Sequence, residues 1–254
     1  MSDLSEKSIQ IYQKIQQAFT AILEQSQLST DKILIQSRGL SPEEAIGTPN
    51  RTDYPILTGQ EVMLMAEYDG AFGQAFTDAP SDYQGSLTEI LSMDIMEDAH
   101  ARGLYIASVN TVLRKLGSME HTVHCKNEEP SECAAEYVGY LRQHYPNTKI
   151  ALVGYQPFLF QEIAKYSDMP LRVLDLNPEN VGKKRFGILV EHGMDDYESV
   201  VGDWADLVLC TSSVFTNGTM DKYVDIEKEV LFYGITGAGP VQLLDLKRHC
   251  PMSH

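Results

Sequence analysis

The amino-acid sequence predicts an α+β region followed by an α/β region built on a parallel sheet. In the first half, one helix-length segment precedes three strand-length apolar runs and two further helices, an order typical of α+β proteins. In the second half, short β-rich runs are largely separated by helix-length segments, which indicates a parallel sheet with helices on its faces. The length of 254 residues fits one large domain or two small ones.

The two regions are expected to pack against each other. We place the boundary near residue 120, at Gly117-Ser118-Met119, which gives regions 1–120 and 121–254. The sequence shows no internal repeat and no low-complexity linker between them. Without a flexible linker, the two regions should form a cleft where they meet.

Each element of the first region has a local signal. Apolar residues at helical spacing predict an amphipathic helix over 4–27. Asp69-Gly70 between two apolar runs predicts a hairpin, and Ser41-Pro42 predicts a helical turn within the loop 38–50. The expected strands are 32–36, 61–67 and 71–77, and the expected later helices are 87–98 and 102–116.

The second region alternates between the two kinds of element. Its apolar runs are too short for helices, and the segments between them are mostly long enough to be helices. The expected strands are 149–154, 171–175, 186–190, 206–211 and 230–234, and the expected helices are 132–144, 158–166, 195–202, 219–226 and a last one from about 238.

Composition and charge limit the class of partner. The formal net charge is −16, which disfavours nucleic acids and anionic membrane surfaces and weakly favours a cation or a ligand that carries one. The N-terminus lacks a basic stretch followed by an apolar core, and no apolar run approaches the ~18 residues of a membrane span. Four cysteines are too few for a disulfide scaffold. We therefore expect a cytoplasmic protein with a small ligand and reduced thiols, and leave a homo-oligomer open.

Ligands of open parallel sheets bind beyond the carboxyl ends of the strands, because the loops and helix N-termini converge there. Asp175 follows Gly154 by 21 residues, a spacing suited to an acid that binds a ribose, but the loop has one glycine where a dinucleotide fingerprint needs three. Equally, these residues could simply form strand-end turns and helix caps. The candidate ligand-binding residues at these strand ends are Gly154, Gln156, Asp175, Asn177, His192, Thr211, Ser212, Asn217, Gly218, Thr219 and Thr236.

A segment rich in histidine and cysteine precedes the second sheet. His121, His124, Cys125 and Cys133 fall within 13 residues, and their donor atoms suit a transition metal such as Zn, Fe, Co or Ni. Cys133 is expected in the first turn of a helix, where the helix dipole favours a thiolate. The spacing matches no standard structural zinc site, so a disulfide-capable loop and thiols without a ligand remain alternatives.

Other reactive side chains carry weaker signals. Cys210 on a strand is expected to be a buried apolar filler, and His249-Cys250 is either a further pair of ligands or a frayed tail. Three acids near the predicted hairpin either face the cleft or are solvated: Glu67, Asp69 and Asp78. No nucleophile elbow, P-loop or His-Glu-x-x-His motif is present, so nothing supports hydrolase chemistry.

Several stretches resemble the putative heavy-metal-chelation family, in which an enolase-N-terminal-like domain precedes a Rossmann-like domain. They are Arg38–Gly47, Gly73–Thr77, Thr122–Cys125, Gly154–Pro157, Asp175–Gly182, Thr211–Thr219 and Gly234–Gly239. The resemblance implies this fold, a ligand site in the interdomain cleft and a role in handling metals or metallocofactors, without an assigned reaction. The family's loop often has a glycine where this chain has Ser212.

The leading hypothesis is therefore a protein that binds a metal ion, a metal chelate or a small anionic ligand in the cleft. In it, the His/Cys segment holds the metal and the strand-end loops hold the organic part. The alternative is an enzyme that uses a nucleotide-like or small organic cofactor, in which Asp175 and Asn217-Gly218-Thr219 would matter more than the cysteines. A protein-interaction module is a third reading, for which no exposed partner stripe is evident.

Overall fold

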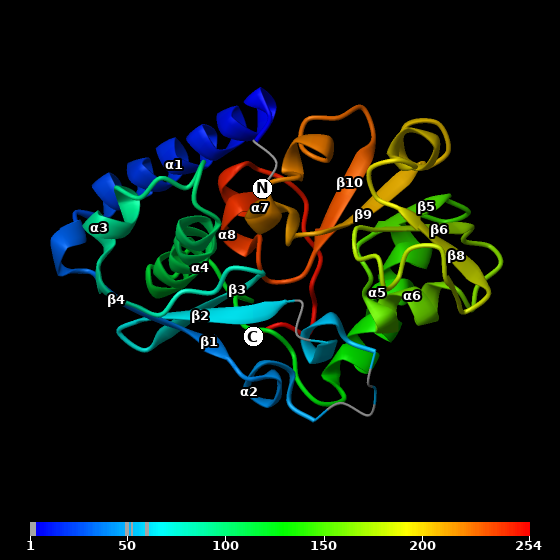
Figure 1. The fold of residues 1–254 in the computed structure, drawn as a ribbon, viewed down its shortest axis with the longest axis horizontal. Coiled ribbons are helices and arrows are strands. Elements are labelled where there is room, and N and C mark those ends of the chain that lie inside the picture. The colour runs from blue at the N-terminus through cyan, green and yellow to red at the C-terminus, as the bar shows by residue number, and fades with distance from the viewer. Residues whose placement is uncertain (1–3, 49–50, 52, 59–60) are drawn as a thin grey trace.

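The computed structural model describes residues 4–48, 51, 53–58 and 61–254 and has a mixed α/β fold with two sheets. The first sheet is antiparallel, with strand order β3-β2-β1-β4. The second has order β10-β9-β5-β6-β8-β7 and is parallel except for the short edge strand β7. Figure 1 shows the first sheet with α1, α3 and α4 on one side of the molecule and the second sheet with α5 and α6 on the other.

The bounds of the elements follow chain order. The strands are β1 (Leu34–Leu40), β2 (Val62–Tyr68), β3 (Ala71–Thr77), β4 (Tyr83–Ser86), β5 (Ile150–Val153), β6 (Leu171–Asp175), β7 (Lys184–Arg185), β8 (Ile188–His192), β9 (Leu207–Thr211) and β10 (Glu229–Tyr233). The α-helices are α1 (Glu6–Ser26), α2 (Pro42–Ile46), α3 (Leu87–Leu91), α4 (Ala99–Lys115), α5 (Glu129–His144), α6 (Pro157–Ile163), α7 (Val214–Asn217) and α8 (Ala238–Leu243). Short helical turns are η1 (Thr30–Lys32), η2 (Pro55–Thr58), η3 (Glu198–Gly202, a π-helix) and η4 (Met220–Lys222).

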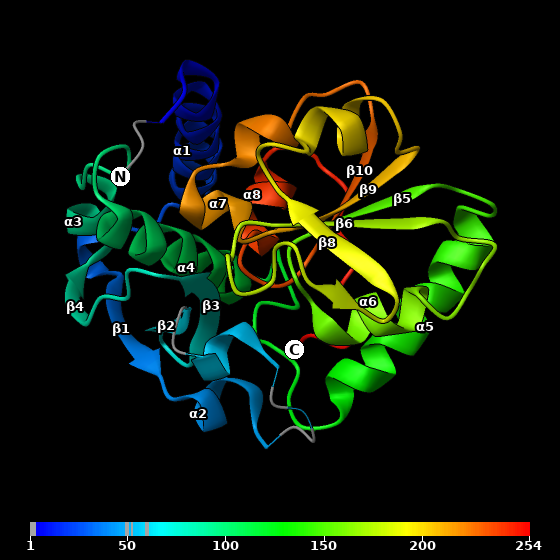
Figure 2. The same ribbon diagram turned by 45° about the vertical axis from the view of Figure 1, so that its right-hand side comes forward.

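The second sheet is covered on both faces, because its strands alternate between two hydrophobic clusters. Ile150 and Leu152 of β5 pack with α5 and α6, whereas Ala151 and Val153 face the larger cluster that contains α1 and α4. Figure 2, turned by 45°, shows α5 and α6 together on one side of the second sheet.

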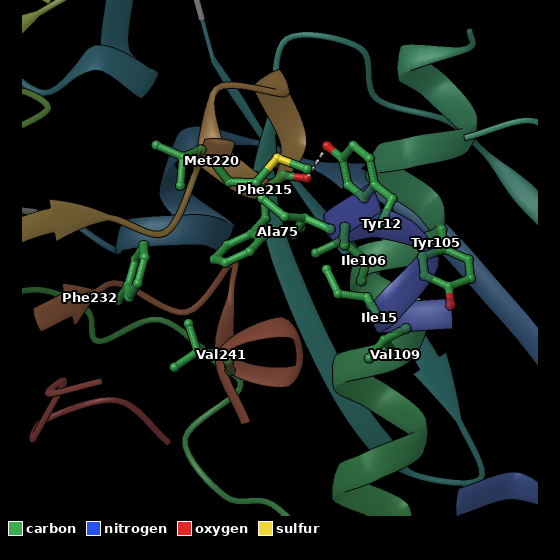
Figure 3. Close-up of a cluster of buried hydrophobic side chains, with 14 of the residues drawn as sticks. Tyr12, Ile15, Ala75, Tyr105, Ile106, Val109, Phe215, Met220, Phe232 and Val241 are labelled. Carbon is green, nitrogen blue, oxygen red and sulfur yellow. Dashed lines mark hydrogen bonds between the residues drawn. The ribbon is translucent and has the colours of Figure 1, made fainter. Parts of the chain in front are cut away.

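The larger cluster is shared by elements far apart in the sequence. Tyr12 and Ile15 of α1 meet Ile106 of α4 and Phe215 of α7, all of them fully or almost fully buried (Figure 3). The Tyr12 hydroxyl donates to the carbonyl of Phe215 at 2.9 Å. The N-terminal helix therefore contributes to the same core as the loops of the second sheet.

A buried amide also connects the two sheets. Asn110 of α4 is fully buried, and its Nδ2 donates to the carbonyls of Gln74, Ile235 and Thr236. Its Oδ1 accepts from the backbone N–H of Gly239 at 2.7 Å. One side chain thereby fixes β3 and the loop before α8 relative to α4.

Most of the predicted elements are present, and the hairpin is confirmed. Asp69 and Gly70 both have positive φ, 47° and 78°, which is the backbone that a tight two-residue turn requires. Ser41 forms a capping box with Glu44, which starts α2 where the helical turn is expected.

Several predicted bounds are wrong. The segment 38–50 is not all loop, because β1 continues to Leu40 through pairing with β2. Helix 87–98 ends at Leu91, and Asp98 instead caps α4 by accepting from His100 N. Strand 186–190 is shifted to 188–192, and helix 195–202 contains a π-helix. The short strands β4 and β7 carry too few apolar residues to be recognised.

The prediction of a helix over 219–226 is also wrong. α7 lies earlier, at Val214–Asn217, and Gly218 ends it with φ 83°. Glycine is suited to this left-handed C-cap, so Asn217-Gly218-Thr219 follows a helix instead of preceding one. Of the described helices, none is both long and apolar enough to cross a membrane.

Candidate functional site

A cavity of about 470 Å³ lies at the carboxyl ends of the second sheet's strands and is closed on its other side by the first region. The strand order reverses at β5. The chain adds β6 and β8 on one side of β5 and then β9 and β10 on the other side. The loops after these strands diverge there and leave a space between them. The first region contributes Ile46, Tyr54, Ile56 and Phe76 to the same cavity.

Twelve of the fifteen candidate residues line this cavity. The fold therefore brings the His/Cys segment together with the candidates at the strand ends. They are His124, Cys125, Cys133, Gly154, Gln156, Asp175, Asn177, Thr211, Ser212, Asn217, Thr219 and Thr236. The described lining residues do not include the other three, His121, His192 and Gly218.

The three candidates outside the cavity have structural partners. The exposed His121 ring contacts the carbonyl of Ser253 through Nδ1. His192 accepts from the backbone N–H of Asp195 through Nδ1 at 3.1 Å, within the turn after β8. Gly218 supplies the positive φ at the end of α7, where a Cβ would come within 2.4 Å of Leu4.

The thiol end of the cavity contains Cys125 and Cys133 in hydrogen-bonding contact. This bond lowers the pKa of Cys133 and, with burial, raises the pKa of Cys125, because an S–H donated by Cys125 stabilises the thiolate form of Cys133. α5 begins at Glu129, so Cys133 lies just past its first turn, not in it as expected. The backbone N–H of Met252 also bonds the Cys133 sulfur and lowers its pKa.

His124 lies beside this pair in a form suited to metal binding. Burial lowers the pKa of its imidazole to about 4, so the ring is neutral at physiological pH. Its Nδ1 bonds the carbonyl of Cys125, and since a carbonyl oxygen can only accept, the proton is on Nδ1. Nε2 therefore keeps the lone pair that a metal needs.

The C-terminal segment is ordered and completes this end, so the frayed-tail alternative is wrong. Val123 and His254 exchange two backbone hydrogen bonds of 2.8 Å, and His249 N donates to the carbonyl of Phe232. Arg248 donates through Nε to the carbonyl of Gly234. These bonds place Cys250 on the cavity wall, close enough to Cys125 to influence its pKa.

The hydroxyl end is formed by the loops after β9 and β10. Thr216 donates through Oγ1 to the carbonyl of Phe76 at 2.8 Å, and Thr236 accepts through Oγ1 from Phe76 N at 2.9 Å. These two bonds fix the loops against the end of β3. Gly154 at the tip of β5 has φ 90°, and a Cβ there would lie 2.8 Å from Cγ2 of Thr211, so only glycine fits.

Asp175 lines the cavity and also makes hydrogen bonds to the loops around it. Its Oδ2 accepts from Tyr155 N at 2.8 Å and from Asn180 Nδ2, and its Oδ1 accepts from Asn177 N at 2.7 Å. Burial is the largest influence and raises the pKa of Asp175 despite these bonds. The carboxylate thus holds the loops after β5 and β6 together through both of its oxygens.

The cavity also contains buried polar atoms without a hydrogen-bond partner. Six buried side-chain atoms of the described residues lack one, and four of these belong to cavity residues. The four are Tyr54 Oη, Tyr137 Oη, Ser212 Oγ and His249 Nε2. An unpaired buried polar group costs about 1–3 kcal/mol, so their concentration here is typical of a site that binds a polar molecule. The sequence suggested Ser212 and His249 as possible ligands but neither tyrosine, because an isolated tyrosine in sequence gives no such signal.

Comparisons with known proteins agree with this architecture. The family model described as putative heavy-metal chelation matches residues 138–242, which include the motifs after β5, β6, β9 and β10. The other three motifs, Arg38–Gly47, Gly73–Thr77 and Thr122–Cys125, lie outside the matched residues. No protein with a curated description matches the chain.

A crystal structure of a protein of unknown function from the same family, from Desulfitobacterium hafniense, has a similar fold. The TM-score is 0.51 at 9% identity, and the similarity covers 92% of this chain and 83% of the other. At this identity the likeness concerns the fold alone. The resemblance to the putative heavy-metal-chelation family that the sequence motifs predict is thus confirmed over residues 138–242.

Proposed function

We propose that the chain binds a small metal chelate in the cavity between its two sheets, with the metal at the thiol end. The single observation that carries the proposal is the paired thiols of Cys125 and Cys133 on the wall of a cavity of about 470 Å³. The description of the matched family, heavy-metal chelation, supports the same reading.

The size of the cavity favours a chelate over a bare ion. A water molecule in the liquid takes up about 30 Å³, and a metal ion needs no more space than that. Sites for small organic molecules typically have volumes of about 300–1,000 Å³. The cavity therefore has room for an organic molecule that carries the metal.

The donor atoms fit a transition metal such as Zn, Co, Ni or Fe. Two thiols and the neutral imidazole of His124 are ligands that such metals prefer. Within the described residues, no three His, Cys, Asp or Glu side chains are close enough to hold one ion together. We accordingly assign Cys125 and Cys133 as the protein ligands, with His124 adjacent, and expect the bound molecule to supply the remaining donors.

The hydroxyl end would hold the organic part of the chelate. The loops after β9 and β10 present hydroxyl and amide groups, and Ser212 Oγ lies among them without a partner. The residues that we assign to this end are Thr211, Ser212, Asn217, Thr219 and Thr236, and Gln156 and Asn177 on the loops after β5 and β6 would also contact the organic part.

We also propose that the chain consists of an enolase-N-terminal-like domain over 1–120 and a Rossmann-like domain over 121–254. The five parallel strands support the second assignment, since numbered along the chain they follow the order 3-2-1-4-5 of a doubly wound sheet. The four-stranded antiparallel sheet with α4 against it supports the first. The ligand would then lie in the interdomain cleft.

Cobalt(II) provides the test, because thiolate coordination gives it a charge-transfer absorption. The reduced protein is titrated with cobalt(II) alone and with the cobalt(II)–histidine complex. We expect saturable absorption with both, and tighter binding of the complex because the cavity accommodates it. Cys125→Ser and Cys133→Ser should each weaken binding at least about tenfold, as expected for loss of a metal ligand.

Cys210→Ala is the matched control. Cys210 is fully buried on β9 and does not line the cavity, so its removal should leave the absorption unchanged. The proposal fails if the wild-type protein takes up neither form of cobalt, or if the Cys133 variant binds as well as the Cys210 variant.

A further inference from the structure

One wall of the cavity carries several acidic residues. Glu61, Asp78 and Asp175 line the cavity, and none of the described lining residues is Lys or Arg. Aromatic side chains, whose faces attract cations, form much of the remaining wall. An anionic group placed here would meet three carboxyl groups and no cation.

Two of these acids lie side by side because of the strand register. Val62 of β2 pairs with Thr77 of β3, so Glu61 and Asp78 flank the same end of this antiparallel pair. Neither carboxyl group has a hydrogen bond or an ion pair with any described residue. Burial, followed by the charges of Asp175 and Asp78, raises the pKa of Glu61 to about 7.

An independent observation points to a ligand at this wall. Ser212 is 1% exposed, and its Oγ has no partner among the described atoms, although the residue lines the same cavity. Its loop is fixed to the end of β3 by the bonds of Thr216 and Thr236 to Phe76, two residues before Asp78. The loop that carries this hydroxyl is therefore joined to the strand end that leads to Asp78.

We infer that Glu61, Asp78 and Ser212 bind a protonated amino group of the molecule in the cavity. An ammonium group has three N–H donors and no acceptor, which two carboxylates and a hydroxyl oxygen can satisfy. The inference rests on the proposed function in that it describes the organic part of the same chelate.

Diamines are suitable probes because they carry the proposed group without a metal. Thermal-shift and calorimetric titrations would compare 1,4-diaminobutane with 1,4-butanediol, a neutral molecule of the same length, at constant ionic strength. We expect saturable binding and a raised Tm with the diamine only. In the variant Glu61→Gln/Asp78→Asn, the affinity should fall at least about tenfold, the loss typical of a removed charge pair.

The hairpin itself offers a matched control. Glu67→Gln/Asp69→Asn changes the net charge by the same amount at the other end of β2, and neither residue lines the cavity. This control should bind the diamine as the wild type does. Ser212→Ala is a second test that alters no charge, and we expect it to weaken diamine binding severalfold.

The inference is overturned if the wild type does not distinguish the diamine from the diol, or if both double variants bind the diamine equally. Cobalt titration of the same variants separates this outcome from failure of the proposed function. Glu61→Gln/Asp78→Asn should still give the thiolate absorption. Loss of cobalt binding in the wild type with diamine binding retained would reject the metal site and leave the amine site standing.

Discussion

The shared hydrophobic core and the cavity both lie where the two sheets meet, yet their buried polar atoms differ in hydrogen bonding. In the core, the hydroxyl of Tyr12 and the amide of Asn110 are fully used in hydrogen bonds between distant elements. In the cavity, Tyr54, Tyr137 and Ser212 keep buried hydroxyls without partners. Among the described residues of the shared core, only Tyr105 has a buried hydroxyl without a hydrogen-bond partner.

This difference separates the part of the interface that stabilises the fold from the part available for binding. A buried polar group that is bonded contributes to stability, whereas an unbonded one costs free energy that a ligand can recover. Among the described residues, the same interface thus has one side where most buried polar atoms are paired and one side where several are not. Four substitutions test this contrast.

Phe215→Ala should have the largest effect. Phe215 is fully buried, its ring lies 5.5 Å from that of Phe232, and it belongs to the core that joins α1 to α7. We expect a loss of about 3–5 kcal/mol in the free energy of unfolding, measured by chemical denaturation. Met194→Ala, at a cavity residue that is 45% exposed, should change it by less than about 0.5 kcal/mol. Comparable losses in the two variants would contradict the distinction.

Asn110→Ala should cost somewhat less, about 2–4 kcal/mol, because it leaves several buried backbone groups unpaired. The same denaturation experiment measures this loss. Since Asn110 connects β3 to the loop before α8, hydrogen exchange of Gly239 N–H should also become faster. An unchanged exchange rate would show that the loop is held by other contacts.

Glu61→Gln should remove a pH dependence of stability. The folded-state pKa of Glu61, about 7, lies above its ordinary value of 4.5, so between these values the folded state holds a proton that the unfolded state releases. Raising the pH through this window should therefore remove about 1–3 kcal/mol of stability contributed by Glu61, measured as the difference between wild type and variant, because the lowered pKa of His124 acts in the opposite direction in both proteins. The variant should lose this slope, whereas Glu97→Gln, at an exposed acid, should retain it. Denaturation midpoints at several pH values give the comparison.

Tyr137→Phe should have the smallest effect. It removes a hydroxyl that has no partner, so stability should be unchanged or rise by up to about 1 kcal/mol. Tyr12→Phe removes a bonded hydroxyl from the core and should lower stability by about 1 kcal/mol. Thermal melts should therefore show stability changes of opposite sign, or a loss only for Tyr12→Phe. Because both variants remove a single hydroxyl, this pair compares the core and the cavity most directly. A clear loss with Tyr137→Phe would mean that its hydroxyl is already satisfied.

Local sequence patterns predicted much of the fold because they act over a few residues. Helical spacing of apolar residues identified α1 and α4, and Asp69-Gly70 identified the β2–β3 hairpin. The patterns failed at Asn217-Gly218-Thr219, because the same residues can either begin or end a helix. There the left-handed conformation of Gly218 ends α7. Edge strands such as β4 carry few apolar residues and gave no signal.

The sequence by itself determined which residues could act: the His/Cys segment and the polar residues that follow the parallel strands. Only the tertiary structure decided which of them meet. Cys250 reaches the cavity through backbone pairing with β10 and with Val123, and Glu61 reaches it through the register of β2 and β3. Such contacts join residues far apart in the chain and depend on which strands pair. No periodicity along the sequence contains that information, because it describes only the neighbours of each residue.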